Sequence, residues 1–213
     1  MEFEFKKYWR KTSFKNIKDG NYLLNHIFLC KPKNFLEIGI FHGVTSRNVC
    51  ELLHSIHGNN FKFTGVDLFE HDDKKLSEEI APHTNFSNPL KQIYYKYIIK
   101  SDPYSYESVA KLLLKFKNNI NIIKGNSNDI LKQMHVNEFD YVFLDGGHKY
   151  ETVKNDLQCL TEVIKNNGTI LCDDYNLSYA PGIKKAIDEY ISENNFNLKI
   201  LNDRFAEITR KEK

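Results

Sequence analysis

The sequence contains no apolar stretch long enough to cross a membrane. None of its 213 residues lies in a run approaching the roughly 18 consecutive apolar residues that a spanning helix needs. The first residues, MEFEFKKYWRK, lack the apolar core of a secretory signal. The net charge of +2 gives no reason to expect nucleic acid or an anionic membrane as a partner. We therefore expect a cytoplasmic protein that binds neither.

Linkers and paired cysteines are also lacking. No Pro-, Ser- or Gly-rich stretch divides the chain, so we expect a single domain over residues 1–213. The four cysteines, which show no CxxC spacing, are Cys30, Cys50, Cys159 and Cys172. Three of them lie in apolar patterns, which favours free buried thiols over disulfides or zinc ligands.

Apolar residues instead alternate between short strand-like runs and helical spacing. Strands are expected at residues 34–38, 61–66, 120–123, 142–144, 169–172, 198–201 and 205–209. Helices are expected at residues 14–30, 49–56, 90–98, 109–116, 150–164 and 183–191. This alternation predicts an α/β, Rossmann-like, doubly wound fold, whose mainly parallel seven-stranded sheet has helices on both faces.

The segment at residues 71–105 is long for a crossover between parallel strands. Pro82, Pro89 and Pro103 interrupt it. We interpret it as an insertion that covers the active site or makes a dimer contact, which leaves a homo-oligomer open. The N-terminal segment, residues 1–33, is expected to add one helix before the sheet.

The most informative stretch is residues 139–156, with the sequence FDYVFLDGGHKYETVKND. It is typical of a buried strand that ends in Asp145, followed by a two-glycine turn and a helix. In open α/β sheets, ligands bind at the carboxyl ends of the strands. Asp145 and the nearby His148 are therefore the first candidates for chemistry.

A second strand ends in the pair Asp173 and Asp174, which should lie beside Asp145. Oxygen-only ligands suit a hard cation, and we expect Mg²⁺. Because consecutive strand residues point to opposite faces, both members of the pair can bind only if the chain turns there. A strand-end aspartate can also simply cap the following helix, so a site without metal stays open.

The first strand runs into a glycine turn within the sequence EIGIFHG, residues 37–43. It is not the dinucleotide fingerprint, because Phe41 and Val44 replace its second and third glycines. No lysine-serine pair follows, which also excludes a phosphate-binding P-loop. Gly39 and Gly43 still let the backbone approach a ligand, and Asp67 ends the next strand, where such folds hold a ribose diol. The pattern predicts a nucleoside-type cofactor.

Five segments together resemble the class I S-adenosylmethionine-dependent methyltransferases. They are LEIGIFHG, GVD, GNSND, FDYVFLDGGHKY and GTILCDDY, and the resemblance covers approximately residues 34–209. The chain is most similar to the O-methyltransferases that include catechol O-methyltransferase and the metal-dependent sugar O-methyltransferases of antibiotic biosynthesis. Tyr175 stands where the catechol group has an asparagine ligand. It matches instead the Asp-Asp-Tyr pattern of the sugar enzymes.

The resemblance implies cofactor contacts at specific positions. The residues that it places at S-adenosylmethionine are Glu37, Gly39, Phe41, Gly43, Thr45, Asp67, Ser127, Asn128 and Asp145. Asp67 matches the carboxylate that holds the ribose hydroxyls, and Thr45 a contact to the methionine carboxylate. Ser127 and Asn128 match positions beside the adenine. A purely local role, at a helix start or in a turn, stays open for Thr45, Ser127 and Asn128.

The resemblance also implies an acid–base and metal centre. Asp145, Asp173 and Asp174 match metal ligands, and His148 stands where the catechol enzymes have their lysine base. A neutral imidazole can take the proton of a hydroxyl whose pKa a metal has lowered. We therefore expect Mg²⁺-dependent O-methylation of a sugar or another small hydroxylated metabolite.

Three alternatives stay open at this point. One is a metal-independent N- or O-methyltransferase with the same cofactor site. Another is a nicotinamide-dependent oxidoreductase, against which the missing glycine fingerprint argues. The last is a cofactor-binding scaffold without catalysis, which uses the aromatic-rich insertion as a partner surface.

Overall fold

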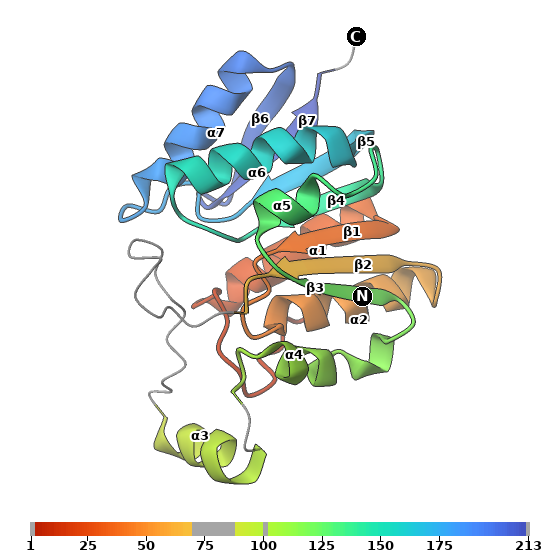
Figure 1. Cartoon of the computed structure of the whole chain (residues 1–213), viewed down its shortest axis with the longest axis vertical. Helices are drawn as coiled ribbons and strands as arrows, with labels where there is room; N and C mark the ends of the chain where they lie inside the picture. Colours follow the sequence, from red (N-terminus) through yellow and green to blue (C-terminus); the bar gives the residue numbers. More distant parts are fainter. Residues whose placement is uncertain (1–2, 70–87, 100–101, 212–213) are drawn as a thin grey trace.

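The computed structural model describes residues 3–69, 88–99 and 102–211 (Figure 1). Its strands are β1 (Asn34–Ile38), β2 (Lys62–Asp67), β3 (Ile120–Lys124), β4 (Phe139–Leu144), β5 (Ile164–Cys172), β6 (Phe196–Leu201) and β7 (Phe205–Arg210). Its α-helices are α1 (Ile17–Cys30), α2 (Val44–His57), α3 (Pro89–Ile93), α4 (Tyr106–Leu112), α5 (Ser127–Leu131), α6 (Tyr150–Val163) and α7 (Pro181–Glu193). Two further segments are the π-helix η1 (Tyr94–Ile99) and the 3₁₀-helix η2 (Leu114–Phe116).

The seven strands form one sheet in the order β3-β2-β1-β4-β5-β7-β6. Strands β1 to β5 are parallel, and β7 runs antiparallel to both β5 and β6. Helices α5, α6 and α7 lie on one side of the sheet, and α1, α2 and α4 lie on the other (Figure 1). The predicted doubly wound α/β fold is confirmed, with one antiparallel hairpin at its edge.

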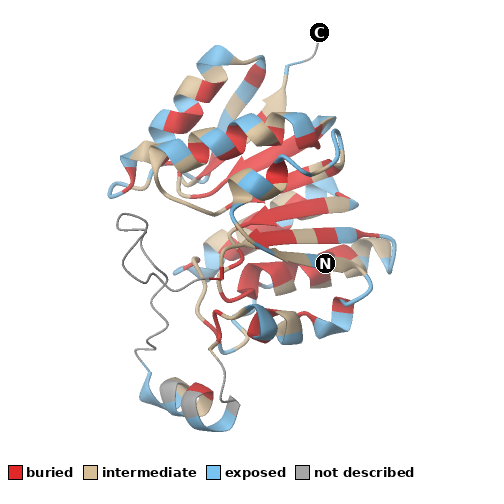
Figure 2. Ribbon diagram, in the orientation of Figure 1, coloured by how far each residue is buried: buried red, intermediate tan, exposed pale blue. Residues whose placement is uncertain are grey.

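Alternate residues of the central strands pack on opposite faces of the sheet. On β4, Tyr141 and Phe143 belong to the core beneath α1 and α2, whereas Val142 and Leu144 belong to the core beneath α6 and α7. The central strands are accordingly buried along most of their length (Figure 2). Burial on both faces explains why β4 has a continuous apolar sequence rather than an alternating one.

The register of the central strands places two acidic residues side by side. Leu144 on β4 is paired with Ile38 on β1 and with Cys172 on β5. The hydrogen-bond ladder continues beyond them, because Asp145 N donates to Ile38 O at 2.8 Å and Asp173 N donates to Leu144 O at 2.9 Å. Asp145 and Asp173 therefore leave the sheet together, at its carboxyl edge.

The boundary between α6 and β5 differs from the sequence prediction. The helix does not reach residues 166–168, because α6 ends at Val163 and β5 begins at Ile164. Gly168 lies within the strand, where a Cβ atom would be 2.7 Å from the Ile164 side chain and 3.1 Å from Asp140 O. The glycine therefore permits close packing inside the sheet and does not end a helix.

Helices α3 and η1 belong to the insertion predicted at residues 71–105. Residues 70–87 and 100–101 lie outside the described part of the chain. The expected amphipathic helix is present, but four of its apolar side chains are at least half exposed: Leu90, Ile93, Tyr97 and Ile98. In Figure 1, α3 lies apart from the sheet and its two helical layers. A role as lid or dimer contact stays a prediction.

Helix α1 confirms the expected N-terminal helix. Asn16 caps it, since its side-chain oxygen accepts a hydrogen bond from Lys18 N at 3.0 Å. Within the described residues, no helix combines the length and the hydrophobicity that crossing a membrane requires. All four cysteines are free. Cys50 and Cys172 are buried, but Cys159 is only partly buried and Cys30 is exposed, so the prediction of buried thiols is wrong for the last two.

Candidate active site

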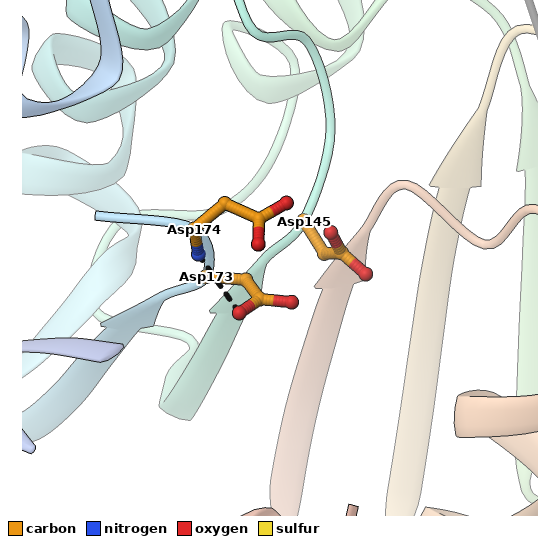
Figure 3. Close-up of side chains that lie close together, drawn as sticks. All are labelled: Asp145, Asp173 and Asp174. Atoms are coloured by element: carbon orange, nitrogen blue, oxygen red, sulfur yellow. Dashed lines mark hydrogen bonds between the residues drawn. The ribbon is translucent and has the colours of Figure 1, made fainter. Parts of the chain in front are cut away.

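The carboxylates of Asp145, Asp173 and Asp174 converge at the carboxyl edge of the sheet (Figure 3). Asp145 follows β4, and the other two follow β5, its neighbour in the sheet. One oxygen from each carboxylate lies within 4.8 Å of the others. The three acids that the sequence predicts to meet are therefore brought together.

A small pocket opens at this cluster. The residues that line it are Leu144, Asp145, Gly146, Gly147, His148, Val153, Cys172, Asp173, Asp174 and Ile183. Gly146 and Gly147 have no side chains, so the turn after β4 can pass close to the cluster. The pocket therefore contains all three acids and the predicted base, His148.

A guanidinium group enters the same cluster. Arg204 donates from Nε to Asp173 Oδ1 at 2.6 Å and from Nη2 to Asp173 Oδ2 at 2.7 Å. Its Nη2 also lies 3.1 Å from Asp174 Oδ1, and its Nη1 lies 3.6 Å from Asp19 Oδ2 on α1. When the cluster acids are ionised, three negative charges and one positive charge leave a formal charge of −2. Such a donor set fits a hard divalent cation.

Burial and mutual repulsion perturb the acids of the cluster. Burial raises the pKa of Asp145 well above its ordinary value, and the nearby Asp173 and Asp174 raise it further. Ser13, in the segment before α1, opposes this shift through a side-chain hydrogen bond to Asp145. Burial raises the pKa of Asp173 to about 6, although its bonds to Arg204 act in the opposite direction. A cation at this position would favour the ionised acids.

The chain turns sharply at Asp174. Its φ of +58° lies in the left-handed region, which non-glycine residues adopt at a cost, and its N donates to Asp173 Oδ1 at 2.8 Å. The turn lets Asp173 and Asp174 point into the same pocket, as metal binding by both requires. Tyr175 then anchors the loop, because its hydroxyl donates to Asp188 Oδ1 at 2.6 Å on α7.

His148 lies at the rim of the cluster. Its Nε2 is 3.5 Å from Asp174 Oδ2, and its side chain is 33% exposed. The carboxylate can orient the imidazole and stabilise the imidazolium that forms when the ring accepts a proton. This arrangement suits a general base that faces both the pocket and solvent.

The glycine turn after β1 lies against the strand that ends in Asp145. Gly39 has a φ of +90°, and a Cβ atom at this position would be 2.0 Å from Asp145 O. Gly43, with a φ of +74°, is the N-cap residue immediately before α2. Only glycine fits the close approach at residue 39, so the turn places the predicted cofactor residues directly beside the acidic cluster.

Asp67 fastens this turn to the end of β2. Its Oδ2 accepts hydrogen bonds from Ile40 N at 2.7 Å and Phe41 N at 2.8 Å. Its Oδ1 accepts from Phe69 N at 2.9 Å and from the Tyr104 hydroxyl at 2.8 Å. Asp67, the residue predicted to bind the ribose, thus lies against the glycine turn, next to Phe41.

Glu37 lies beneath the turn and is fully buried. Its Oε2 accepts a hydrogen bond from Ser46 Oγ at 2.5 Å, while its Oε1 is buried without a partner among the described residues. Burial raises the pKa of Glu37 to about 8. Thr45, at the start of α2, is also buried. A buried carboxyl oxygen without a partner fits a site where a polar ligand group binds.

Ser127 and Asn128 are the first residues of α5, a short helix that the sequence does not predict. The Asn126 side chain caps this helix by accepting a hydrogen bond from Asn128 N at 3.0 Å. Asn128 Oδ1 is inaccessible and has no partner among the described residues. This amide oxygen is able to accept a bond from an exocyclic amine such as that of adenine.

Three residues of the site are missing from the sequence prediction: Ser13, Tyr104 and Arg204. Each contacts a predicted acid from a distant part of the chain, and Arg204 is separated from Asp173 by 31 positions. A buried contact between residues that are distant in the chain has no signature in the sequence, neither a periodicity nor a local motif. The approach of β7 to β5 had to be known before Arg204 could be placed at the site.

Comparison with known proteins gives one family and several similar structures. A family model described as a methyltransferase domain matches residues 36–175. No curated protein matches the sequence. The match spans more than half of the chain, so it identifies the family.

Three solved structures share the fold. The SAH-bound methyltransferase PaMTH1 of Podospora anserina is 18% identical, with 93% of this chain and 80% of that one covered and a TM-score of 0.60. The O-methyltransferase NovP is 18% identical, with coverages of 89% and 80% and a TM-score of 0.63. An O-methyltransferase from Bacillus cereus, in complex with SAH, is 12% identical, with coverages of 93% and 81% and a TM-score of 0.58.

Proposed function

Because the chain belongs to the methyltransferase family that matches residues 36–175, we propose that it transfers a methyl group from S-adenosylmethionine to a hydroxyl oxygen. The acceptor is a sugar or another small hydroxylated metabolite. The observation that supports this proposal most directly is the pocket in which Asp145, Asp174 and His148 meet, beside the glycine turn. O-methyltransferases among the similar structures agree with it.

The chain holds the cofactor at the carboxyl ends of β1 and β2. Asp67 binds the ribose hydroxyls, the turn from Gly39 to Gly43 lies against the methionine part, and Asn128 lies beside the adenine. The buried Oε1 of Glu37 has no partner among the described residues, and the inaccessible Oδ1 of Asn128 has acceptor capacity to offer. S-adenosylmethionine supplies the electrophilic methyl group when it is bound.

The acidic cluster holds the acceptor. Asp145, Asp173 and Asp174 would hold Mg²⁺, which would lower the pKa of an acceptor hydroxyl. Arg204 keeps Asp173 oriented, and Asp174 orients His148. His148 then accepts the hydroxyl proton at Nδ1, the ring nitrogen that does not face Asp174, which leaves the oxygen free to attack. Most of the rate enhancement comes from holding the reacting atoms in line at contact distance.

Transfer is tested by measuring S-adenosylhomocysteine formation with purified protein, Mg²⁺ and a panel of sugars, catechols and other small polyols. We expect product that depends on one acceptor class and disappears in His148→Ala. Absence of S-adenosylmethionine binding under all conditions would contradict the proposal.

One observation favours a metal-independent version of the reaction as the second candidate. Arg204 already provides a positive charge that contacts both oxygens of Asp173. The guanidinium can compensate part of the cluster's negative charge without a cation. EDTA distinguishes the two versions, because turnover that survives complete chelation would establish the metal-independent one.

A further inference from the structure

The carboxylate of Asp67 accepts four hydrogen bonds from the described residues. Three donors are backbone N–H groups, those of Ile40, Phe41 and Phe69, and the fourth is the hydroxyl of Tyr104. A carboxylate has about four lone-pair positions, so these donors use its whole capacity. A ribose hydroxyl can bind Asp67 only if one of them leaves.

The three backbone donors are fixed by the fold. Ile40 and Phe41 belong to the glycine turn, and Gly39 N donates to Val66 O at 2.9 Å, which ties this turn to β2. Phe69 is two residues beyond Asp67, so its N–H closes a local turn on the same carboxylate. The Tyr104 hydroxyl is the donor at the end of a rotatable side chain, and it can leave without a change in the backbone.

The Tyr104 side chain lies within the predicted cofactor site. It is 5% exposed, and its ring centroid lies 6.0 Å from that of Phe41 and 6.0 Å from that of Phe69. These two residues follow β1 and β2, at the edge of the sheet where ligands of doubly wound folds bind. The phenol oxygen, 2.8 Å from Asp67 Oδ1, therefore occupies hydrogen-bonding space that a ribose hydroxyl needs.

Arg10 holds the backbone on both sides of Tyr104. Its Nη1 donates to Pro103 O at 3.2 Å and to His42 O at 3.0 Å, and its Nη2 donates to Ser108 O at 2.9 Å. Arg10 is buried, so these bonds are shielded from water. These bonds of Arg10 fix the backbone near Tyr104 to the glycine turn. Rotation of the Tyr104 side chain is therefore the way to release Asp67.

We propose that Tyr104 is a cofactor-site residue whose hydroxyl competes with the ribose diol for Asp67, and which turns away when the cofactor binds. The inference rests on the proposed function, because it requires a ligand with a ribose. It assigns to Tyr104 the role of lowering cofactor affinity, because its hydrogen bond to Asp67 must break before the diol can bind. Loss of the hydroxyl therefore strengthens binding of ligands that have the diol.

The test is a calorimetric titration of S-adenosylhomocysteine into wild type, Tyr104→Phe and Tyr106→Phe. The phenylalanine at 104 keeps the packed ring and removes the competing hydroxyl, and we expect about tenfold tighter binding, the effect of one hydrogen bond to a charged group. Tyr106 is the matched control, because its ring also contacts Phe69 but makes no hydrogen bond to Asp67 among those of the described residues. We expect its variant to bind as wild type does.

Two further measurements test whether competition for Asp67 causes the tighter binding expected for Tyr104→Phe. Adenosine should gain affinity in Tyr104→Phe, whereas 2′,3′-dideoxyadenosine, which lacks the diol, should not. In wild type labelled with ¹³C at tyrosine Cζ, the resonance that Tyr104→Phe removes should shift when S-adenosylhomocysteine is added. A merely structural role for the tyrosine would produce neither the diol dependence nor the shift.

Equal or weaker binding of S-adenosylhomocysteine by Tyr104→Phe would overturn the inference and leave the proposed function intact. An equal gain with the dideoxy nucleoside would overturn it as well. Absence of binding in wild type and both variants would instead overturn the proposed function, and this inference with it.

Discussion

Arg204 and Asp173 form a bidentate ion pair at the carboxyl edge of the sheet, with N···O distances of 2.6 and 2.7 Å. Asp173 is almost completely buried, with a side-chain exposure of 1%. The pair joins the turn before β7 to the end of β5, and it orients one of the three clustered acids. Its removal should therefore affect both the stability of the fold and the geometry of the site.

Arg204→Gln should lower the free energy of unfolding by about 3 kcal/mol, because it leaves a buried carboxylate without its counter-charge. Urea unfolding at neutral pH measures this change. Arg204→Lys keeps the charge but loses the bidentate geometry, so its loss should be smaller. Stability of the glutamine variant within about 0.5 kcal/mol of wild type, the range of a neutral surface change, would show that the pair is not a stabilising contact.

Mg²⁺ binding should depend on Asp174. Asp174→Ala removes one of three oxygen ligands, and we expect at least about 100-fold weaker binding, since changes outside the ligand set already cost 10- to 100-fold. Calorimetric titration of Mg²⁺ measures the affinity. Asp129→Ala, at an exposed acid of α5, is the control and should bind as wild type does. Equal affinity in the two variants would argue against a metal at the cluster.

The base is tested by His148→Ala. Removal of a general base should lower kcat by about 10² to 10⁴ while S-adenosylhomocysteine still binds. His135, an exposed histidine, provides the control His135→Ala. Unchanged kcat in His148→Ala would assign the proton transfer to another group.

The raised pKa of Glu37 should make the stability of the fold depend on pH. Its pKa is about 8 in the folded protein, against an ordinary value of 4.5, so between these values the folded state binds a proton that the unfolded state has released. Stability should therefore fall as the pH rises through this window, by up to about 1.4 kcal/mol per pH unit. Glu37→Gln removes the titration.

Urea unfolding of wild type and Glu37→Gln from pH 4.5 to pH 8 measures this contribution. The free energy of unfolding of wild type, minus that of the variant, should decline steadily with rising pH. A constant difference would show that Glu37 is ionised inside the fold.

Sequence patterns predict most of the fold because its central strands have a simple physical signature. Burial of β4 on both faces requires an uninterrupted apolar run, which the residues 142–144 provide. Parallel pairing then brings Asp145 and Asp173 together, since both follow paired strand residues. The acidic cluster is therefore foreseeable once the strand ends are identified.

The sequence-based prediction is wrong where one residue type is compatible with two different structural roles. Gly168 is compatible with a helix end, but its place in β5 depends on contacts with Ile164 and Asp140 that only the folded sheet supplies. The apolar face predicted at residues 90–98 is present, and Leu90 on this face is 67% exposed, so what the face packs against stays open. Periodicity identifies such a face and does not show what it packs against.

The central claim is that the chain binds S-adenosylmethionine through Asp67 and the glycine turn. Calorimetric titration of S-adenosylhomocysteine into wild type and Asp67→Ala tests it most directly, with NAD as the competing nucleoside cofactor. We predict saturable one-site binding by wild type, at least about tenfold weaker binding by Asp67→Ala, and no binding of NAD. Absence of S-adenosylhomocysteine binding by wild type, or equal affinity in the two proteins, would contradict the account.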